Sequence, residues 1–199
     1  TCYRLWSQGS HVNLVGNRSP EILGADLAPL MLELSQWGIR NVNDLVWVTP
    51  PPPGAVSQAL DLLGDLGAIH EKTITDRGRE MLALPTHPRI AHMLLQAKDA
   101  GKINRHELSL ATDIAALLEE RDPMPKGSGA DLALRVELLR RWRKGERVGA
   151  DKSLLERIER VALSWRQLFN IEVDNSIVAD TEVGKCVMAA YPERIAGQI

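Results

Sequence analysis

The sequence predicts a mainly α-helical protein, and three observations lead to that fold class. Aromatic residues make up only 4% of the chain, while Leu and Ala, which favour helices, recur throughout. Apolar residues return at helical spacing in most segments after Asp26. Only one pair of segments, at residues 68–69 and 73–75, has the pattern of a small hairpin.

Size and charge limit the classes of protein that this chain can belong to. Its 199 residues can form one or two domains, and its formal net charge of −2 excludes a chain that attracts nucleic acid over its whole surface. No stretch approaches the roughly 18 apolar residues that span a bilayer, so no membrane partner is expected. Cys2 and Cys186 lie at opposite ends without CxxC spacing, which predicts no zinc site and fits a reducing cytosol.

The first elements are short. Residues 2–7 alternate in the manner of a strand, which would need a sheet elsewhere to pair with. Ser19, Pro20 and Glu21 have the order of a helix start, so a short helical turn is expected there. An amphipathic helix is predicted from Asp26 to Gly38, with the glycine in the left-handed terminating position. Its apolar positions are Leu27, Leu30, Met31, Leu34 and Trp37.

The next segments predict a winged helix. After a brief segment at 43–48, Pro53 can lie in the first turn of a helix over 54–66. The hairpin at 68–75 follows, and Asp76 is expected to cap a further short helix that ends near Leu84. The order helix, short helix, helix, hairpin is the winged-helix variant of the helix-turn-helix.

Beyond Pro85 the pattern changes to longer helices with short polar breaks, which predicts a helical bundle. The residues from Asp122 to Gly129 are expected to form an exposed loop within it rather than a domain boundary. The helix at 151–170 has a continuous apolar stripe opposite a charged side that includes Arg166. The expected helices are 88–100, 105–120, 130–144, 151–170 and 180–191.

Several segments, in order along the chain, resemble DEAH-box ATP-dependent helicases of the HrpB type. They are CYRLWS at 2–7, PEI at 20–22, DLAPLMLEL at 26–34, WGI at 37–39, PPPPGAVSQALDLLGDLGAI at 50–69, TDRGREMLALPTHPRIAHMLLQA at 75–97, IAALLEERDP at 114–123 and AAYPERIA at 189–196. The resemblance implies that residues 1–19 are the tail of the second motor domain. Residues 20–84 would then be the winged helix, and 85–199 a ratchet-like helicase-associated bundle.

The same resemblance implies a cytoplasmic, RNA-helicase-like parent protein that uses ATP and Mg²⁺. In that parent, this region would pack on the motor domains of the same polypeptide and help enclose single-stranded nucleic acid, RNA more than DNA. The 199 residues themselves lack the GxxxxGK[ST] loop, the DEAH box and the arginine-rich motif. We therefore expect no catalytic residues, no cofactor and no ATPase activity in this piece alone.

The sequence suggests one candidate binding face. Between Arg135 and Arg147 six basic residues stand against two acidic ones, a local balance of +4. At 100° per residue, one face of this helix would carry Arg140, Arg143, Lys144 and Arg147, which we predict to contact the backbone of a single strand. The alternative is a charged face that is only solvated.

Other candidates are weaker. The helix expected at 54–66 carries Asp61 and Asp65 and no Lys or Arg, so we expect a scaffold rather than a helix that binds duplex grooves. The five histidines have no paired metal-ligand spacing, and we predict no metal site. Two rival functions stay open at this point: a free-standing winged-helix regulator of duplex DNA, and a module that docks another protein through exposed apolar surface.

Overall fold

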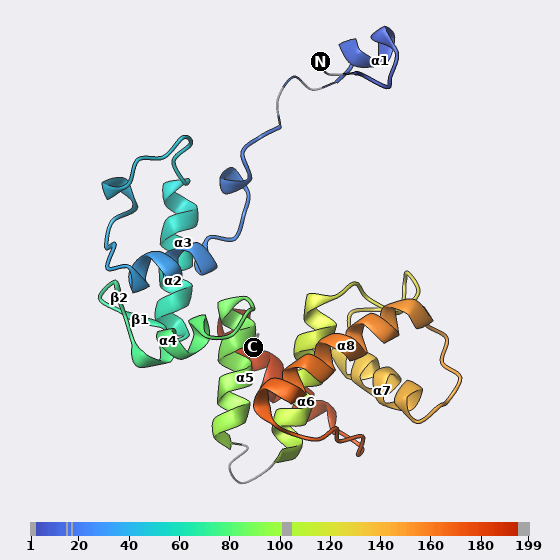
Figure 1. Cartoon of the computed structure of the whole chain (residues 1–199). Coiled ribbons are helices and arrows are strands. Elements are labelled where there is room, and N and C mark those ends of the chain that lie inside the picture. The colour runs from blue at the N-terminus through green and yellow to red at the C-terminus, as the bar shows by residue number, and fades with distance from the viewer. Residues whose placement is uncertain (1–2, 15, 17, 101–104, 195–199) are drawn as a thin grey trace, which may run out of the picture.

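A computed structural model describes residues 3–14, 16, 18–100 and 105–194, and it confirms the mainly helical fold class (Figure 1). Helix α1, Gln8–Val12, lies on an extended N-terminal segment that stands away from the rest of the chain (Figure 1). The strand predicted at 2–7 is wrong for residues 3–7, and Cys2 lies outside the described residues. Backbone groups of a strand need a partner, and the described chain offers residues 3–7 no sheet to join.

The next part contains the predicted winged-helix elements. They are η1, Glu21–Leu23; α2, Ala28–Gln36; η2, Val42–Asp44; α3, Pro53–Asp65; β1, Ile69–His70; β2, Thr73–Ile74; and α4, Asp76–Leu82. Helix α2 begins where the Asp26 carboxylate accepts a hydrogen bond from the Ala28 amide at 2.9 Å. It ends before Gly38, whose φ of +81° confirms the predicted left-handed termination.

The wing is a two-residue hairpin. Strands β1 and β2 pair antiparallel, with Ile69 opposite Ile74 and His70 opposite Thr73. Glu71 and Lys72 between them both have positive φ, 47° and 61°, as tight hairpin turns require. The predicted cap of the following helix was misplaced by one residue, because the hydroxyl of Thr75, not Asp76, accepts the Gly78 amide hydrogen bond at 3.0 Å.

The second part is a bundle built around one central helix. Its elements are α5, Pro88–Ala100; α6, Arg105–Glu119; α7, Leu132–Arg143; α8, Lys152–Phe169; α9, Asp180–Ala190; and η3, Pro192–Arg194. Helix α6 packs against α5, α7, α8 and α9, and all its residues from Leu108 to Leu117 are buried. Such a helix is surrounded on every side, so any charged residue on it must find its partners inside the bundle.

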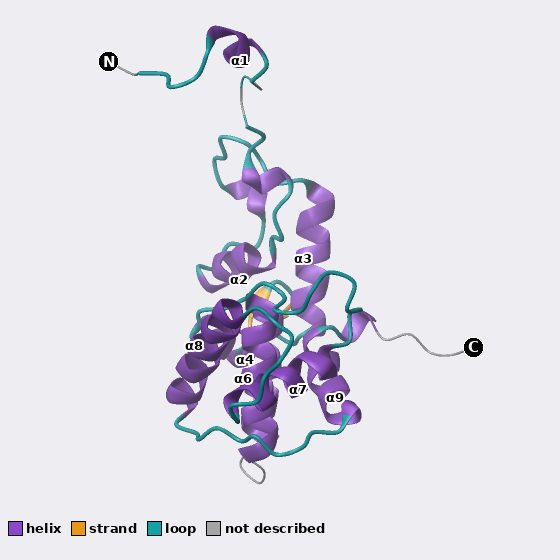
Figure 2. Cartoon of the chain, turned by 90° about the vertical axis from the view of Figure 1, so that its right-hand side faces the viewer, coloured by secondary structure: helices purple, strands orange, loops and turns teal. Residues whose placement is uncertain are grey.

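The two parts share a continuous core, and α4 lies against α5 where they meet (Figure 1). The turned view in Figure 2 also shows the N-terminal segment with α1 standing away from both parts. At the junction, Nε2 of His87 lies 3.2 Å from a carboxylate oxygen of Asp26. The proposed domain boundaries after residues 19 and 84 remain predictions. No helix in the described part of the chain is long and apolar enough to cross a membrane.

Candidate nucleic-acid interface

Two of the four predicted strand-binding residues, Arg140 and Arg143, lie on helix α7; Lys144 is its C-cap, and Arg147 lies in the segment after it, outside the predicted helical face. Helix α7 begins at Asp131, whose carboxylate accepts a hydrogen bond from the Ala133 amide at 2.9 Å. It ends at Lys144, followed by Gly145 with a φ of +83°. The Lys144 and Arg147 side chains are exposed at this end, whereas those of Arg140 and Arg143 are only 5% and 6% exposed.

The two buried arginines point to a single carboxylate on the central helix. Asp113 is fully buried on α6, and its Oδ2 accepts a hydrogen bond from Nε of Arg140 at 3.2 Å. Its Oδ1 accepts one from Nη2 of Arg143 at 2.7 Å. Paired and hydrogen-bonded ions of this kind avoid the large cost of an isolated buried charge.

Helix α8 completes this group. Nη1 of Arg166 lies 3.4 Å from Oδ1 of Asp113, and its Nη2 donates to Glu159 at 2.6 Å. Glu159 also accepts a hydrogen bond from Nε of Arg143 at 2.5 Å. We call these five residues the Asp113 cluster: Asp113, Arg140, Arg143, Glu159 and Arg166. Its three guanidinium groups face two carboxylates, so the cluster carries one excess positive charge.

Nearby polar groups accept further hydrogen bonds from the arginines of the cluster. Nη1 of Arg140 donates to the Ser176 carbonyl at 2.6 Å, and Nη1 of Arg143 lies 3.4 Å from the Asn175 side-chain oxygen. Burial alone would lower the pKa of Arg143, but the carboxylates of Asp113 and Glu159 outweigh it and raise that pKa. Arg143 therefore remains positively charged, and the hydrogen bonds of the cluster connect α6, α7, α8 and the segment before α9.

The expected solvent-facing orientation is thus wrong for Arg140 and Arg143, whose side chains are buried, while contact of the four residues with a strand stays a prediction. A helical wheel places them on a polar face, but that face meets buried carboxylates instead of solvent. Arg166, which the sequence placed on the charged outer side of α8, is also buried. One signal points to this arrangement: Asp113 is the one charged residue in the sequence from Leu108 to Leu117, and a lone carboxylate on a mostly apolar helix needs cationic partners.

The rest of the basic run is largely paired as well. Arg135 is buried and lies 2.6 Å from the Asp122 carboxylate, and Arg141 lies 2.7 Å from that of Glu146. For Lys144 and Arg147 the described chain shows no ion pair, and they stay candidates for a phosphate contact. Asp61 and Asp65 are exposed on α3, which is unfavourable for contact with a DNA backbone.

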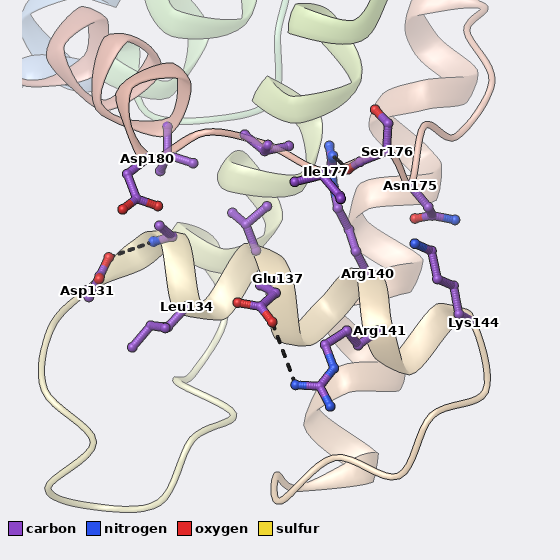
Figure 3. Close-up of a pocket in the computed structure, with 14 residues that line it drawn as sticks. Asp131, Leu134, Glu137, Arg140, Arg141, Lys144, Asn175, Ser176, Ile177 and Asp180 are labelled. Atoms are coloured by element: carbon purple, nitrogen blue, oxygen red, sulfur yellow. Dashed lines mark hydrogen bonds and ion pairs between the residues drawn. The ribbon is translucent and has the colours of Figure 1, made fainter.

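A pocket of about 340 Å³ lies along α7, between this helix and the segment that leads into α9 (Figure 3). No group of three potential metal ligands occurs among the residues that the structure describes. Cys186 on α9 is buried, and burial raises the pKa of its thiol to about 12, so it remains a protonated thiol at neutral pH.

Comparison with known proteins gives a consistent set of relatives, although no family model matches the chain. It is 38% identical over 115 residues to the ATP-dependent RNA helicase HrpB of Escherichia coli, which covers 58% of this chain and 13% of that protein. It is 33% identical over 102 residues to the human probable ATP-dependent RNA helicase DHX35, covering 50% of this chain and 14% of that protein.

Solved structures agree with these relatives. Two crystal structures of E. coli HrpB match 94% of this chain, with TM-scores of 0.64 and 0.66 and sequence identities of 25% and 26%. The chain covers only 20% and 21% of those two proteins. The predicted resemblance to DEAH-box helicases of the HrpB type, and the helical fold that it implied, are therefore confirmed.

Proposed function

Because this chain is similar in sequence and fold to HrpB-type DEAH-box helicases, we propose that it is an accessory region of an ATP-dependent, RNA-helicase-like motor protein. In this proposal it packs on the motor domains of the same polypeptide and helps enclose single-stranded nucleic acid, RNA more than DNA. The observation that carries the proposal is the match of 94% of the chain to HrpB structures with detectable sequence identity.

The bundle would contribute part of the wall around the strand. Lys144 and Arg147 are the exposed basic residues that remain of the predicted face, and positive grooves are how proteins follow a single strand without reading its sequence. The preference for RNA is supported by the names of the relatives, which are RNA helicases. The acidic exposed positions on α3 favour a scaffolding role for the winged helix over that of a duplex-reading regulator.

ATP and Mg²⁺ would be bound by the motor domains. The 199 residues contain no GxxxxGK[ST] loop and no DEAH box, so this region would couple to ATP turnover without performing it. Purified residues 1–199 are expected to hydrolyse no ATP above a buffer control, with or without RNA. The protein would act in the cytoplasm, where its two cysteines remain reduced.

Photochemical crosslinking of the intact parent protein tests the proposal. A 4-thiouridine-containing 12-nucleotide RNA is irradiated on the protein, and the attached peptides are identified by mass spectrometry. We expect attached peptides from residues 85–199 as well as from the motor domains. Attachment to the motor domains alone would remove this region from the strand-binding channel.

A further inference from the structure

The pocket along α7 has apolar walls and an apolar rim. Val136 on α7 and Val183 on α9 are buried in its walls, being 1% and 4% exposed. At the rim, Leu134 is 45% exposed and Ile177 is 94% exposed (Figure 3). Exposed aliphatic side chains beside a concave apolar surface are typical of a site that another molecule covers.

The charges around the pocket are divided between its two ends. Asp131 and Asp180 lie at one end, and Lys144 and Asn175 lie at the other (Figure 3). Between them, Glu137 lies 3.6 Å from Arg141, so that pair is locally balanced. The pocket therefore has an acidic end, an apolar middle and a basic end.

The basic end also contains an unused hydrogen-bond donor. Nη2 of Arg140, a pocket-lining residue that is 4% exposed, is buried and has no acceptor within the described part of the chain. Buried donors in native proteins are nearly always paired, and the Asp113 cluster already carries one excess positive charge. The exposed Lys144 and the excess positive charge of the Asp113 cluster beneath it thus make the basic end favour a negatively charged group of a ligand.

We propose that this pocket docks a short peptide segment with one or two large apolar side chains, flanked by small residues, between a basic residue and an acidic residue. The basic residue would face Asp131 and Asp180, and the acidic residue would face Lys144. The volume of about 340 Å³ lies at the small end of the usual range of ligand pockets, about 300–1,000 Å³. It fits a few side chains rather than a long helix.

The charges favour a peptide over a nucleic-acid strand. A strand laid along the pocket would bring phosphates beside Asp131 and Asp180, and like charges across an interface are unfavourable. A bipolar peptide meets an opposite charge at each end.

Fluorescence anisotropy with residues 1–199 tests the proposal. The probe is the fluorescein-labelled peptide Lys-Ala-Leu-Ile-Ala-Glu, and a second probe has Lys in place of the final Glu. We expect saturable binding of the first probe. Lys144→Glu should weaken it about tenfold and should favour the second probe, because a close charge pair that is reversed contributes at least that factor.

Two further variants locate the site. Ile177→Asp changes an exposed rim residue, so it should abolish peptide binding without unfolding the chain, which circular dichroism checks. The matched control is Lys126→Glu, an exposed lysine that does not line the pocket, and it should leave both affinities within twofold.

The proposal would be overturned if the first probe showed no saturable binding. It would also be overturned if Lys144→Glu and Lys126→Glu lost equal affinity for the first probe, or if Lys144→Glu bound the second probe no better than the first. A labelled 12-nucleotide uridine strand is titrated in parallel. Strand binding that Ile177→Asp abolishes would assign the pocket to nucleic acid and would likewise overturn it.

Discussion

Asp113 on α6 and Arg143 on α7 form a buried ion pair, with Oδ1 of the carboxylate accepting a hydrogen bond from Nη2 of the guanidinium at 2.7 Å. The Asp113 carboxylate is completely inaccessible to solvent, and it also contacts Arg140 on α7 through Oδ2 and Arg166 on α8 through Oδ1. A single aspartate on the central helix therefore determines how α7 and α8 are placed around it. This relationship is the basis for the first two predictions.

Replacing Asp113 by Asn should destabilise the bundle strongly. It removes the charge that three buried arginines share, and breaking a buried pair by deleting one partner typically costs about 3–5 kcal/mol. Urea unfolding followed by circular dichroism measures the change. Asp180→Asn, at an exposed acidic position, is the matched control and should change the free energy of unfolding by less than about 0.5 kcal/mol.

Two neighbouring basic residues at the end of α7, Arg143 and Lys144, should lose very different amounts of stability when they are replaced by alanine. Arg143→Ala removes hydrogen bonds to Asp113 and Glu159, and we expect a loss of about 2–3 kcal/mol, since bonds to charged groups contribute about 1.5–3 kcal/mol. Lys144→Ala should cost less than about 0.5 kcal/mol, because its side chain is exposed. Equal stabilities of the two variants would contradict the inward orientation of Arg143.

Local signals in the sequence predicted most elements of the fold, while tertiary contacts decided the rest. Helix α5 has the predicted bounds, because Pro88 starts it and its apolar positions are regular. The predictions of a terminal strand and of solvent-facing Arg140 and Arg143 side chains were wrong for one shared reason. A strand at residues 3–7 requires a partner strand, and a solvent-facing orientation of Arg140 and Arg143 requires that no carboxylate of another helix faces them. Both conditions depend on residues that are distant in the sequence. Asp113, the one charged residue from Leu108 to Leu117, was the signal in the sequence that basic side chains would be buried against α6.

The stability of the chain should fall as the pH drops below about 6.5. Burial lowers the pKa of both His87 and His92 from the usual 6.5, although Asp26 opposes this at His87. The folded state then binds fewer protons than the unfolded state. The contribution of these two histidines to the free energy of unfolding is complete above pH 6.5, and it is lost as the pH falls through their lowered pKa values in the folded state. Unfolding free energies between pH 7.5 and 5 measure the slope.

The double variant His87→Gln with His92→Gln isolates this effect, because it keeps every other titrating group. Its free energy of unfolding should change less between pH 7.5 and 5 than that of the parent chain. Nε2 of His87 lies 3.2 Å from Asp26, so this carboxylate offsets part of the effect of burial on the pKa of His87. Identical slopes in the two proteins would mean that neither histidine contributes.

Gly78→Ala should destabilise the wing. A Cβ on Gly78 would collide with the carbonyl oxygen of Ala68 and would lie 2.7 Å from Cγ1 of Ile74, so α4 would have to move away from the hairpin. Overpacking of this kind costs about 1–3 kcal/mol. The control is Gly64→Ala on α3, where nothing lies within 4 Å, and it should stabilise the helix by about 0.5–1 kcal/mol. Thermal unfolding of both variants checks the difference in sign.

The last prediction concerns strand binding by Lys144, the C-cap of α7, and by Arg147 in the segment after it. If Lys144 and Arg147 contact phosphates, each contact releases counterions, and affinity should fall steeply with salt concentration. In the intact helicase, Lys144→Ala with Arg147→Ala should weaken binding of all single strands alike. The salt slope should become shallower by about one to two units, about one for each lost contact.

The salt slope separates a direct contact from an indirect loss of structure. Arg143→Ala should weaken binding only through damage to the Asp113 cluster, and such damage shows as reduced stability with little change in slope. The double variant should show the reverse: a shallower slope in a protein whose unfolding curve is unchanged. Fluorescence titration of labelled strands at several salt concentrations, with urea unfolding of the same samples, distinguishes these patterns. An unchanged slope in a folded double variant would mean that Lys144 and Arg147 are only solvated, and the strand contact would then belong to another helix of the bundle.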